Sequence, residues 1–316
     1  MPESLPKVLC TVPIPLEQLS ALKGLAEVVL PAPGPSAADR STVFGLISDC
    51  VAVISQGELR VDEELLDAAP CLRFVANAAM GIDNLDLVAL RNRGIQSSNT
   101  PDAFAESTAD LAMGLLLSLL RRIAETDRYV RTGSWAQGME ALRWEGTHLA
   151  GKTLGLIGYG RIAKLVEKRA QAFEMRVIHT RSSPSDNPKA RSLELLLTES
   201  DAVLTLVPLT EQTHHLIDAD RLSQMKPGAV FINVARGKVM DERAVVAALQ
   251  SGHLAGAAFD VFENEPKVQS ALFEMDNVVL TPHVGGATRE QRERGRREAA
   301  EAVAKFLRRE SVESLT

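Results

Sequence analysis

The chain has 316 residues, of which 45% are hydrophobic and 24% charged, and its net charge at pH 7 is −6. This length favours two domains, the negative charge gives no general basis for binding nucleic acid or an anionic membrane, and the longest nearly apolar run, Leu111–Leu120, is too short to cross a bilayer. The three cysteines, Cys10, Cys50 and Cys71, lack metal-ligand spacing, so we expect buried free thiols, no metal site and a cytoplasmic globular protein.

The first hundred residues alternate short apolar strands with helices. The predicted strands are Val8–Thr11, Val28–Leu30, Val51–Ile54, Phe74–Ala76 and Ile95–Ser97. The helices predicted between them are Glu17–Leu22, Asp39–Ile47, Asp62–Ala69 and Leu85–Arg91. Such alternation is typical of a parallel sheet with helices on both faces, the doubly wound class of α/β fold.

A long apolar helix is predicted next. It begins after the capping sequence Thr100-Pro101-Asp102 and runs to about Ala124. Because the helix is apolar on nearly every side, we expect it to be buried all round, between domains or between subunits. An irregular arm, Tyr129–Leu149, is predicted to lead from it into the second half of the chain.

The middle of the chain carries a glycine-rich turn between a strand and a helix. The predicted strand is Thr153–Ile157, the turn contains Gly158 and Gly160, and a helix and a second strand, Met175–Ile178, follow. Glycines at such a turn let backbone N–H groups approach a pyrophosphate at the positive end of the helix. The glycine spacing alone is a weak signal, but its strand–turn–helix–strand context predicts a dinucleotide-binding unit.

Four more strands are predicted after this unit, at Ala202–Leu206, Val230–Asn233, Gly256–Phe259 and Val278–Leu280. In an open α/β sheet, ligands bind beyond the carboxyl ends of the strands. The side chains predicted near those ends include Arg236, Asp260, Glu265 and His283.

Three of these side chains suit hydride transfer to a 2-oxo acid. A histidine such as His283 can protonate the oxygen on which charge develops, and a carboxylate such as Glu265 favours its imidazolium form. Arg236 can hold the substrate carboxylate with two hydrogen bonds. Each residue alone also suits a structural role, as a surface residue, a turn cap or an ion-pair partner, but their joint placement at the strand ends favours function.

In order and spacing, four segments resemble the D-isomer-specific 2-hydroxyacid dehydrogenase family: Leu154–Ala163, Phe231–Gly237, Ala258–Pro266 and Thr281–Gly286. The resemblance covers nearly the whole chain. It implies two doubly wound parallel-sheet domains, with a Rossmann dinucleotide-binding domain, residues 99–287, inserted in a flavodoxin-like substrate-binding domain, residues 1–98 and 288–316. The helix from about Thr288 would return to the first domain, and the long helix after Pro101 would belong to a homodimer interface.

The resemblance also implies roles for individual residues. Arg236, Glu265 and His283 would form the catalytic trio, and Asp260 would meet the nicotinamide amide. The substrate carboxylate would rest on Ala79, Met80 and Gly81 and on Arg236. The cofactor-binding residues would be Gly158, Gly160, Arg161, Ile162, Arg181, Ser182, Pro208, Thr213, Ala235, Asp260 and Gly285.

The end of the second strand of the dinucleotide unit bears on cofactor choice. Folds selective for NAD place an acid there, whereas this chain has Arg181 followed by Ser182 and Ser183. An arginine flanked by hydroxyls binds a 2′-phosphate well, which predicts that NADP(H) is preferred over NAD(H). The alternative is that Arg181 points to solvent in an enzyme indifferent to the phosphate.

The predicted substrate is a small 2-oxo or D-2-hydroxy acid, with glyoxylate and hydroxypyruvate first. The loop Asn77–Ile82 has no basic residue, which argues against a phosphorylated substrate, while pyruvate-like and larger apolar 2-oxo acids stay open. Arg143 and Trp144 either reach the site from the arm or, in the case of Trp144, serve in packing. The alternative function is a non-catalytic protein of the same fold that senses nicotinamide redox state, like the corepressors of the family.

Overall fold

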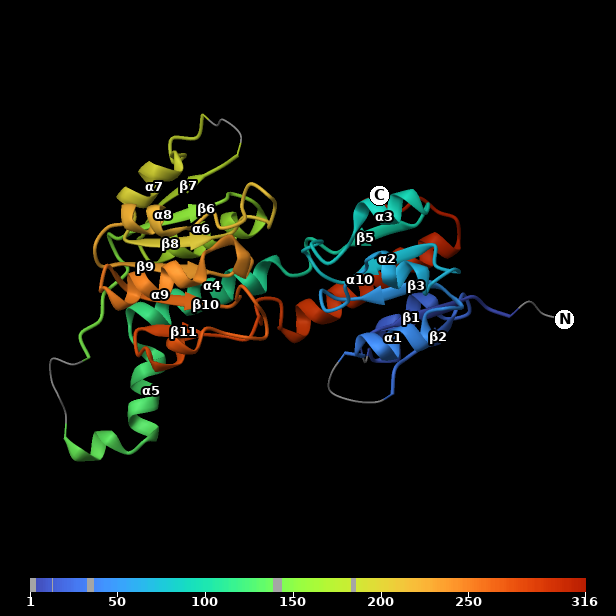
Figure 1. Cartoon of the computed structure of the whole chain (residues 1–316), viewed down its shortest axis with the longest axis horizontal. Helices are drawn as coiled ribbons and strands as arrows, with labels where there is room; N and C mark the ends of the chain where they lie inside the picture. Colours follow the sequence, from blue (N-terminus) through green and yellow to red (C-terminus); the bar gives the residue numbers. More distant parts are fainter. Residues whose placement is uncertain (1–3, 13, 33–36, 139–143, 183–185) are drawn as a thin grey trace. The chain divides into compact units, whose positions relative to one another are not determined.

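The computed structural model describes residues 4–12, 14–32, 37–138, 144–182 and 186–316, which form two compact units. The first unit takes in the chain up to Phe104 and from Ala287 onward, and the second is Ala105–Gly286 (Figure 1). Each unit is built on a parallel sheet, so the predicted α/β class is confirmed. Within the described ranges, no helix is long and apolar enough to cross a membrane.

The first unit contains a five-stranded sheet in the order β2-β1-β3-β4-β5, which is the flavodoxin-like order. Its strands are β1 (Lys7–Cys10), β2 (Glu27–Val29), β3 (Cys50–Ser55), β4 (Phe74–Asn77) and β5 (Gln96–Asn99). Its helices are η1 (Leu16–Leu22), α1 (Arg40–Leu46), α2 (Glu63–Asp67), α3 (Leu87–Asn92) and α10 (Arg289–Leu307). The segment predicted as a helix at 17–22 is thus a 3-10 helix, η1.

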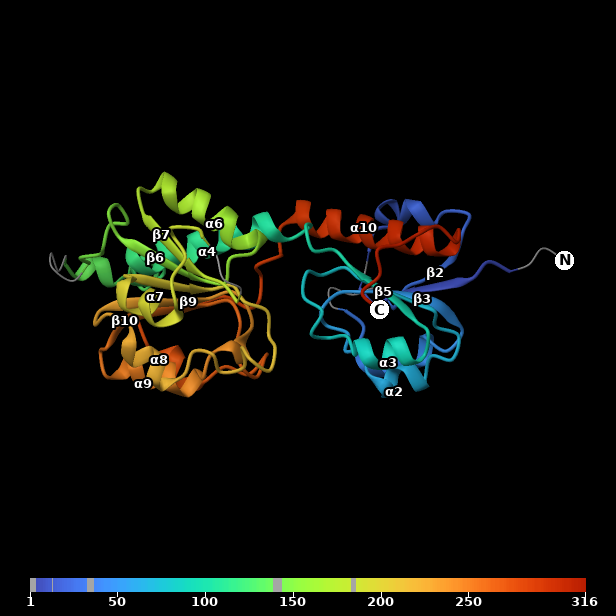
Figure 2. The ribbon, with the colours of Figure 1, turned by 90° about the horizontal axis from the view of Figure 1, so that it is seen from above.

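Helices cover both faces of this sheet. The side chains of α1, α2 and α3 pack on one face, and those of η1 and α10 pack on the other (Figure 2). Phe74 of β4 stacks on Phe306 of α10, with ring centroids 4.9 Å apart. Aspartates cap α1, α2 and α3 by accepting hydrogen bonds from backbone N–H groups of the first turn, which is why these short helices begin where they do.

The second unit contains a six-stranded parallel sheet in the order β11-β10-β9-β8-β6-β7. Its strands are β6 (Thr153–Ile157), β7 (Arg176–Thr180), β8 (Ala202–Thr205), β9 (Ala229–Asn233), β10 (Leu254–Phe259) and β11 (Val278–Leu280). The strand order reverses between β6 and β8, and ligands of such sheets bind at the carboxyl ends on either side of this point.

The helices of the second unit also lie on both faces of its sheet. They are α4 (Ala105–Leu120), α5 (Ile123–Arg131), α6 (Arg161–Ala172), α7 (Leu193–Glu199), α8 (Ala219–Gln224) and α9 (Glu242–Gln250), with 3-10 helices η2 (Ser134–Gln137), η3 (Gly237–Val239) and η4 (Ser270–Glu274). The side chains of α4 and α6 pack on one face and those of α7, α8 and α9 on the other, a division that Figure 2 shows for α4, α6, α8 and α9.

The long helix predicted to reach about Ala124 is two helices. The first, α4, ends at Leu120, and Arg122 adopts a left-handed backbone conformation with φ +54° before α5 begins. The Arg122 guanidinium donates hydrogen bonds of 2.7 and 2.9 Å to Glu125 and lies 5.6 Å from the ring centroid of Trp144. These contacts offset the cost of the left-handed residue. Trp144 also packs on Tyr129, at 4.7 Å between ring centroids, in agreement with a packing role.

One prediction about burial is wrong, and another stays a prediction. Burial of α4 on every side, between domains or between subunits, stays a prediction; within the single chain, Glu106 and Asp110 of this helix are exposed and form ion pairs with Arg169 of α6. The thiol of Cys71 is exposed, whereas Cys10 and Cys50 are buried as expected. The apolar sequence around Cys71 gave no sign of this exposure.

Candidate active site

The glycine-rich turn fits a dinucleotide pyrophosphate. Gly158 has φ +95°, and a Cβ there would lie 2.8 Å from Val207 Cγ1, so only glycine is tolerated. Gly160 caps the start of α6 and has no atom within 4 Å of a Cβ built on it. The space in front of the helix start is therefore open to a ligand phosphate. Arg161 is exposed at the first turn of α6, and Ile162 packs into the core beneath it.

The structure brings His283 and Glu265 together although they are 18 residues apart. The Nδ1 atom of His283 lies 2.8 Å from Oε2 of Glu265, and Oε1 of Glu265 accepts a 2.9 Å hydrogen bond from the Phe262 backbone N–H. The bond to Glu265 raises the pKa of His283 above its ordinary value, against the opposing effect of burial. Burial also pushes the pKa of Glu265 upward, but its bonds to His283 and Phe262 outweigh this and hold that pKa below its ordinary value. The pair therefore favours imidazolium beside carboxylate.

The loop that carries His283 is organised by the buried carboxylate of Asp260, which is 1% exposed. Asp260 accepts hydrogen bonds of 2.8 Å from the backbone N–H groups of Val284 and Gly285, and one of 2.6 Å from the Thr281 hydroxyl. The backbone N–H of His283 donates to the Asp260 carbonyl at 2.8 Å. These bonds hold His283 in a left-handed conformation, φ +53°, that a non-glycine residue rarely adopts. Sequence reasoning assigned Asp260 to the nicotinamide and missed this organising role.

Arg236 follows β9 in a turn shaped by a second residue that sequence reasoning missed. Asn233 is fully buried, accepts hydrogen bonds from Thr205 Oγ1 (2.6 Å) and Ala235 N (3.0 Å), and donates one from Nδ2 to the Arg236 carbonyl (3.0 Å). A polar residue ending an apolar strand was the available signal. The Arg236 guanidinium donates a 2.8 Å bond to the Ala235 carbonyl, and its charge contributes to lowering the pKa of Glu265 and opposes the rise in the pKa of His283.

The loop carrying Glu265 is fastened at both ends by another buried carboxylate. Glu242, 2% exposed, accepts hydrogen bonds from the backbone N–H groups of Glu263 (2.9 Å) and Gln269 (3.0 Å). The Glu263 side chain in turn lies 2.7 Å from His215 Nε2. The position of Glu265 therefore depends on α9, a helix that carries none of the predicted site residues.

Other predicted cofactor residues lie around the carboxyl ends of β7 and β8. Arg181 and Ser182 are exposed just after β7. Pro208 follows β8, and its carbonyl accepts a 2.6 Å hydrogen bond from the Thr213 hydroxyl. Ser183 and Arg143 lie outside the residues that the structure describes.

The predicted substrate loop belongs to the first unit, and its carbonyl groups accept hydrogen bonds from neighbouring residues of that unit. The carbonyls of Ala79, Met80 and Gly81 accept hydrogen bonds from Thr100 N (3.0 Å), Asn99 Nδ2 (2.8 Å) and Asn77 Nδ2 (2.8 Å), respectively. Within the described part of the chain, no hydrogen bond uses the backbone N–H groups of Met80 and Gly81. This leaves two donors for an anionic ligand.

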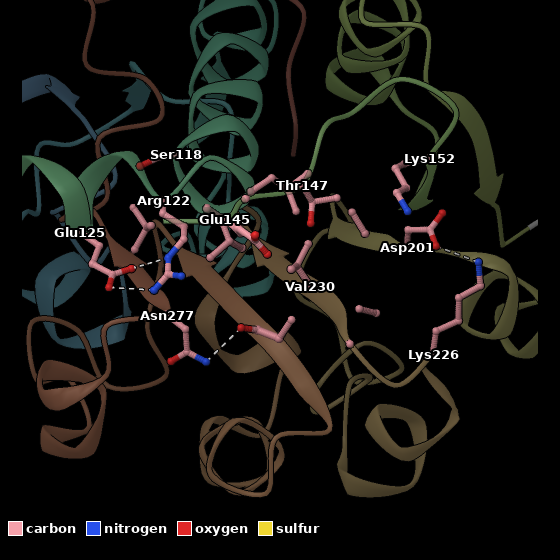
Figure 3. Close-up of a pocket in the computed structure, with 18 of the residues that line it drawn as sticks. Ser118, Arg122, Glu125, Glu145, Thr147, Lys152, Asp201, Lys226, Val230 and Asn277 are labelled. Atoms are coloured by element: carbon pink, nitrogen blue, oxygen red, sulfur yellow. Dashed lines mark hydrogen bonds and ion pairs between the residues drawn. The ribbon is translucent and has the colours of Figure 1, made fainter. Parts of the chain in front are cut away.

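A cavity of about 460 Å³ lies at the opposite, amino-terminal edge of the second sheet (Figure 3). Its charged lining includes Arg122, Glu125, Lys152, Asp201 and Lys226, and none of the predicted site residues line it. The carboxyl edge, where the strand ends bring the predicted chemistry together, is thus separate from this hollow. Among the described residues, no group of three His, Cys, Asp or Glu side chains is arranged to hold a metal ion.

Comparison with known proteins bears on what this arrangement does. Residues 113–285 match the family model described as "D-isomer specific 2-hydroxyacid dehydrogenase, NAD binding domain". The glyoxylate reductase of Pyrococcus furiosus is 42% identical over 279 residues, which cover 85% of this chain and 81% of that protein.

Solved structures agree over the whole length. A protein from Thermus thermophilus has a TM-score of 0.90 and 38% identity, covering 98% of this chain and 100% of its own. The NADPH-dependent glyoxylate/hydroxypyruvate reductase of Sinorhizobium meliloti, solved with NADP and malonate, has a TM-score of 0.86 and 33% identity, covering 99% and 96%. The resemblance inferred from the four sequence segments is confirmed: the chain belongs to the D-isomer-specific 2-hydroxyacid dehydrogenase family and is an oxidoreductase.

Proposed function

We propose that this protein is a reductase of small 2-oxo acids, with glyoxylate and hydroxypyruvate as substrates and NADPH as the hydride donor. The observation that carries the proposal is the pair of His283 and Glu265, 2.8 Å apart beyond the ends of β10 and β11. The bond to Glu265 raises the pKa of His283 and so favours the protonated imidazole that reduction of a carbonyl requires. Relatives named as glyoxylate reductases support the substrate class.

The roles of the residues follow from their atoms. The bound cofactor supplies the hydride that adds to the carbonyl carbon. Because Nδ1 of His283 is engaged by Glu265, its Nε2–H is the group that gives a proton to the carbonyl oxygen. Arg236 binds the substrate carboxylate by a forked pair of hydrogen bonds. The product is the 2-hydroxy acid, which is glycolate, without a stereocentre, from glyoxylate and the D enantiomer of glycerate from hydroxypyruvate.

NADP(H) is the preferred cofactor in this proposal. The exposed Arg181 and Ser182 stand where an NAD-selective fold places an acid, and a guanidinium binds a phosphate dianion far better than a neutral ribose. We expect kcat/KM for NADPH to exceed that for NADH by at least about tenfold, which is about 1.4 kcal/mol of discrimination. Equal values, or a preference for NADH, would refute the cofactor assignment.

The first experiment follows oxidation of NADPH and of NADH with glyoxylate, hydroxypyruvate, pyruvate, 2-oxoisocaproate and phenylpyruvate. Strong NADPH turnover with the first two supports the proposal, whereas turnover confined to the last two would move the substrate class to larger apolar acids. No turnover with any of them, despite tight cofactor binding, would contradict the reductase.

An Arg236→Ala variant separates an enzyme from a nicotinamide sensor. The enzyme proposal expects turnover to be lost while cofactor affinity is kept, because Arg236 acts on the substrate. Arg243→Ala, which changes an exposed arginine of α9, is the matched control and should keep both. Absence of turnover already in the unmodified protein would favour the sensor, a function that its enzyme relatives do not support.

A homodimer and a cytoplasmic location are also part of the proposal. Exposed apolar side chains of α5 and η2, at Ile123, Val130 and Trp135, favour association of these helices with a second copy. Sedimentation at micromolar concentration should give the dimer mass, and a monomer would refute it.

A further inference from the structure

A buried carboxylate joins the two segments of the predicted NADP(H) site. Glu167 lies on α6 and is 7% exposed. It accepts a hydrogen bond from the hydroxyl of Tyr159, the residue between the two glycines of the turn. It also pairs with Lys189 Nζ, and Gln171 donates to it at 3.1 Å. A single side chain in the middle of a helix thus contacts both the pyrophosphate turn and the loop that follows β7.

The loop after β7 returns to the strand that it left. It begins at Arg181 and comes back beside His179, whose backbone N–H donates to the Lys189 carbonyl at 3.0 Å. The backbone N–H of Arg191 then donates to the His179 carbonyl at 2.9 Å. The Lys189 side chain is therefore the anchor that ties the returning end of this loop to α6, in addition to its backbone bonds to β7.

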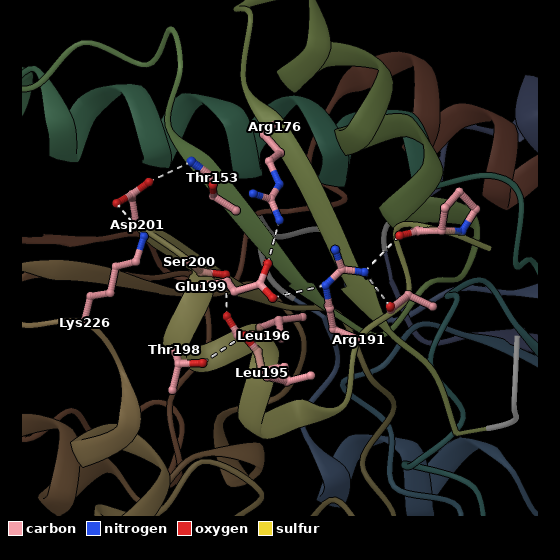
Figure 4. Close-up of polar contacts among 12 residues, drawn as sticks. Thr153, Arg176, Arg191, Leu195, Leu196, Thr198, Glu199, Ser200, Asp201 and Lys226 are labelled. Carbon is pink, nitrogen blue, oxygen red and sulfur yellow. Dashed lines mark hydrogen bonds and ion pairs between the residues drawn. The ribbon is translucent and has the colours of Figure 1, made fainter. Parts of the chain in front are cut away.

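The positive charge near the carboxyl end of β7 comes from lysine and arginine side chains and not from His179. His179 is fully buried and stacks on Tyr159, with ring centroids 3.7 Å apart. Burial lowers the pKa of His179, and the nearby Arg181 and Lys189 act in the same direction, so the ring stays neutral near pH 7. Arg191, the third cation, is committed to Glu199, which it shares with Arg176 (Figure 4).

We propose that Glu167, through Lys189 and Tyr159, is the positioning residue that sets discrimination between NADP(H) and NAD(H). Lys189 fixes the returning end of the loop beside His179, two residues before Arg181, and Tyr159 holds the glycine turn, so the two parts of the site keep one spacing. Lys189 also neutralises Glu167, whose charge would otherwise repel a phosphate dianion. This inference rests on the proposed preference for NADP(H), and it adds residues that do not themselves bind the 2′-phosphate.

The contacts of Glu167 with Lys189 and with Tyr159 have different consequences for cofactor binding. Lys189→Met removes a cation, frees the returning end of the loop and leaves Glu167 without its cation, and all three effects act on a 2′-phosphate. We expect the Kd for NADP⁺ to rise about tenfold and the Kd for NAD⁺ to change by less than about twofold. Tyr159→Phe loosens the turn that receives the pyrophosphate of either dinucleotide, so it should weaken both by a similar factor.

The test is calorimetric titration of each purified full-length variant with NADP⁺ and NAD⁺, and with 2′,5′-ADP and 5′-AMP as probes of the phosphate alone. Lys226→Met is the matched control, because Lys226 also pairs with a half-buried acid, Asp201, and is 39% exposed against 43% for Lys189. Lys226 lines the cavity at the amino-terminal edge of the sheet (Figure 3), so Lys226→Met should leave the NADP⁺/NAD⁺ ratio unchanged.

The outcomes separate this inference from the cofactor assignment. The inference is supported if Lys189→Met loses the preference for NADP⁺ over NAD⁺ while Lys189→Arg, which keeps the charge, retains it. A preference in the unmodified protein that Lys189→Met retains overturns the inference alone, as does an equal loss for both dinucleotides. No preference in the unmodified protein overturns the cofactor assignment and this inference together. If Lys189→Met does not fold, Lys189→Gln is titrated in its place with the same expectations.

Discussion

Gly237→Ala would test whether Arg236 and Glu265 act as one assembled site. A Cβ on Gly237 would lie 1.9 Å from the carbonyl carbon and oxygen of Phe262 and 2.4 Å from the backbone nitrogen of Glu263. These are backbone atoms of the loop that carries Glu265, so no side-chain rotation relieves the overlap. Since ordinary contacts begin at 3.4 Å, the loop or the Arg236 turn must retreat by about 1.5 Å.

A displacement of that size has consequences for both activity and stability. Misplacing catalytic groups by about 1 Å can cost about 100-fold in rate, so we expect kcat to fall by about that factor. Forcing atoms into a packed interior costs about 1–3 kcal/mol, which lowers Tm by roughly 2–4 °C for each kcal/mol in a domain of this size. The affinity for the dinucleotide should fall by a smaller factor than kcat, because the pyrophosphate turn at Gly158 and Gly160 follows a different strand, β6.

The assay combines steady-state kinetics with glyoxylate, calorimetric titration of the cofactor, and scanning calorimetry. Gly45→Ala is the matched control. Gly45 is exposed in α1, a Cβ there meets no atom within 4 Å, and alanine in a helix is more stable than glycine by about 0.5–1 kcal/mol. A folded Gly237→Ala protein with unchanged kcat would refute the argument that contact between the two loops sets the catalytic geometry.

Three further predictions concern the same unit. Glu265→Gln replaces the carboxylate that raises the pKa of His283 with a neutral amide, so the imidazolium is lost at lower pH and the alkaline limb of kcat/KM for reduction should move to lower pH; an unchanged pH profile would exclude Glu265 from this role. Asp260→Asn leaves too few acceptors for the N–H groups that it binds, and urea denaturation should show a loss of about 1–3 kcal/mol, whereas no loss would contradict the organising role. Phe231→Ala empties a fully buried position in β9 and should cost about 3–5 kcal/mol by the same measurement, and a cost below about 1 kcal/mol would mean that the core refills the space.

Local patterns in the sequence predicted much of this molecule because they report local physics. Alternating apolar strands and helices predicted both parallel sheets, and the strand, turn and helix around Gly158 were found with strand β6 at its predicted bounds. The family was recognised from four short segments and is confirmed. These features depend on the backbone preferences of each element and on which of its faces is buried. Both are determined by residues that are close together in the sequence.

Other features depend on partners that are distant in the sequence. The break at Arg122 has no glycine or proline that would predict it, and one of the contacts that stabilise it is with Trp144, 22 residues further along the chain. Glu167 and Glu242 are acidic residues on helices, yet each is buried because loops from other parts of the unit place N–H groups or cations around it. The sequence by itself determined which chemical groups stand at the strand ends. Only the tertiary structure decided their geometry, because the buried carboxylates that hold the His283 and Glu265 loops do so through contacts across 21 to 27 residues of chain.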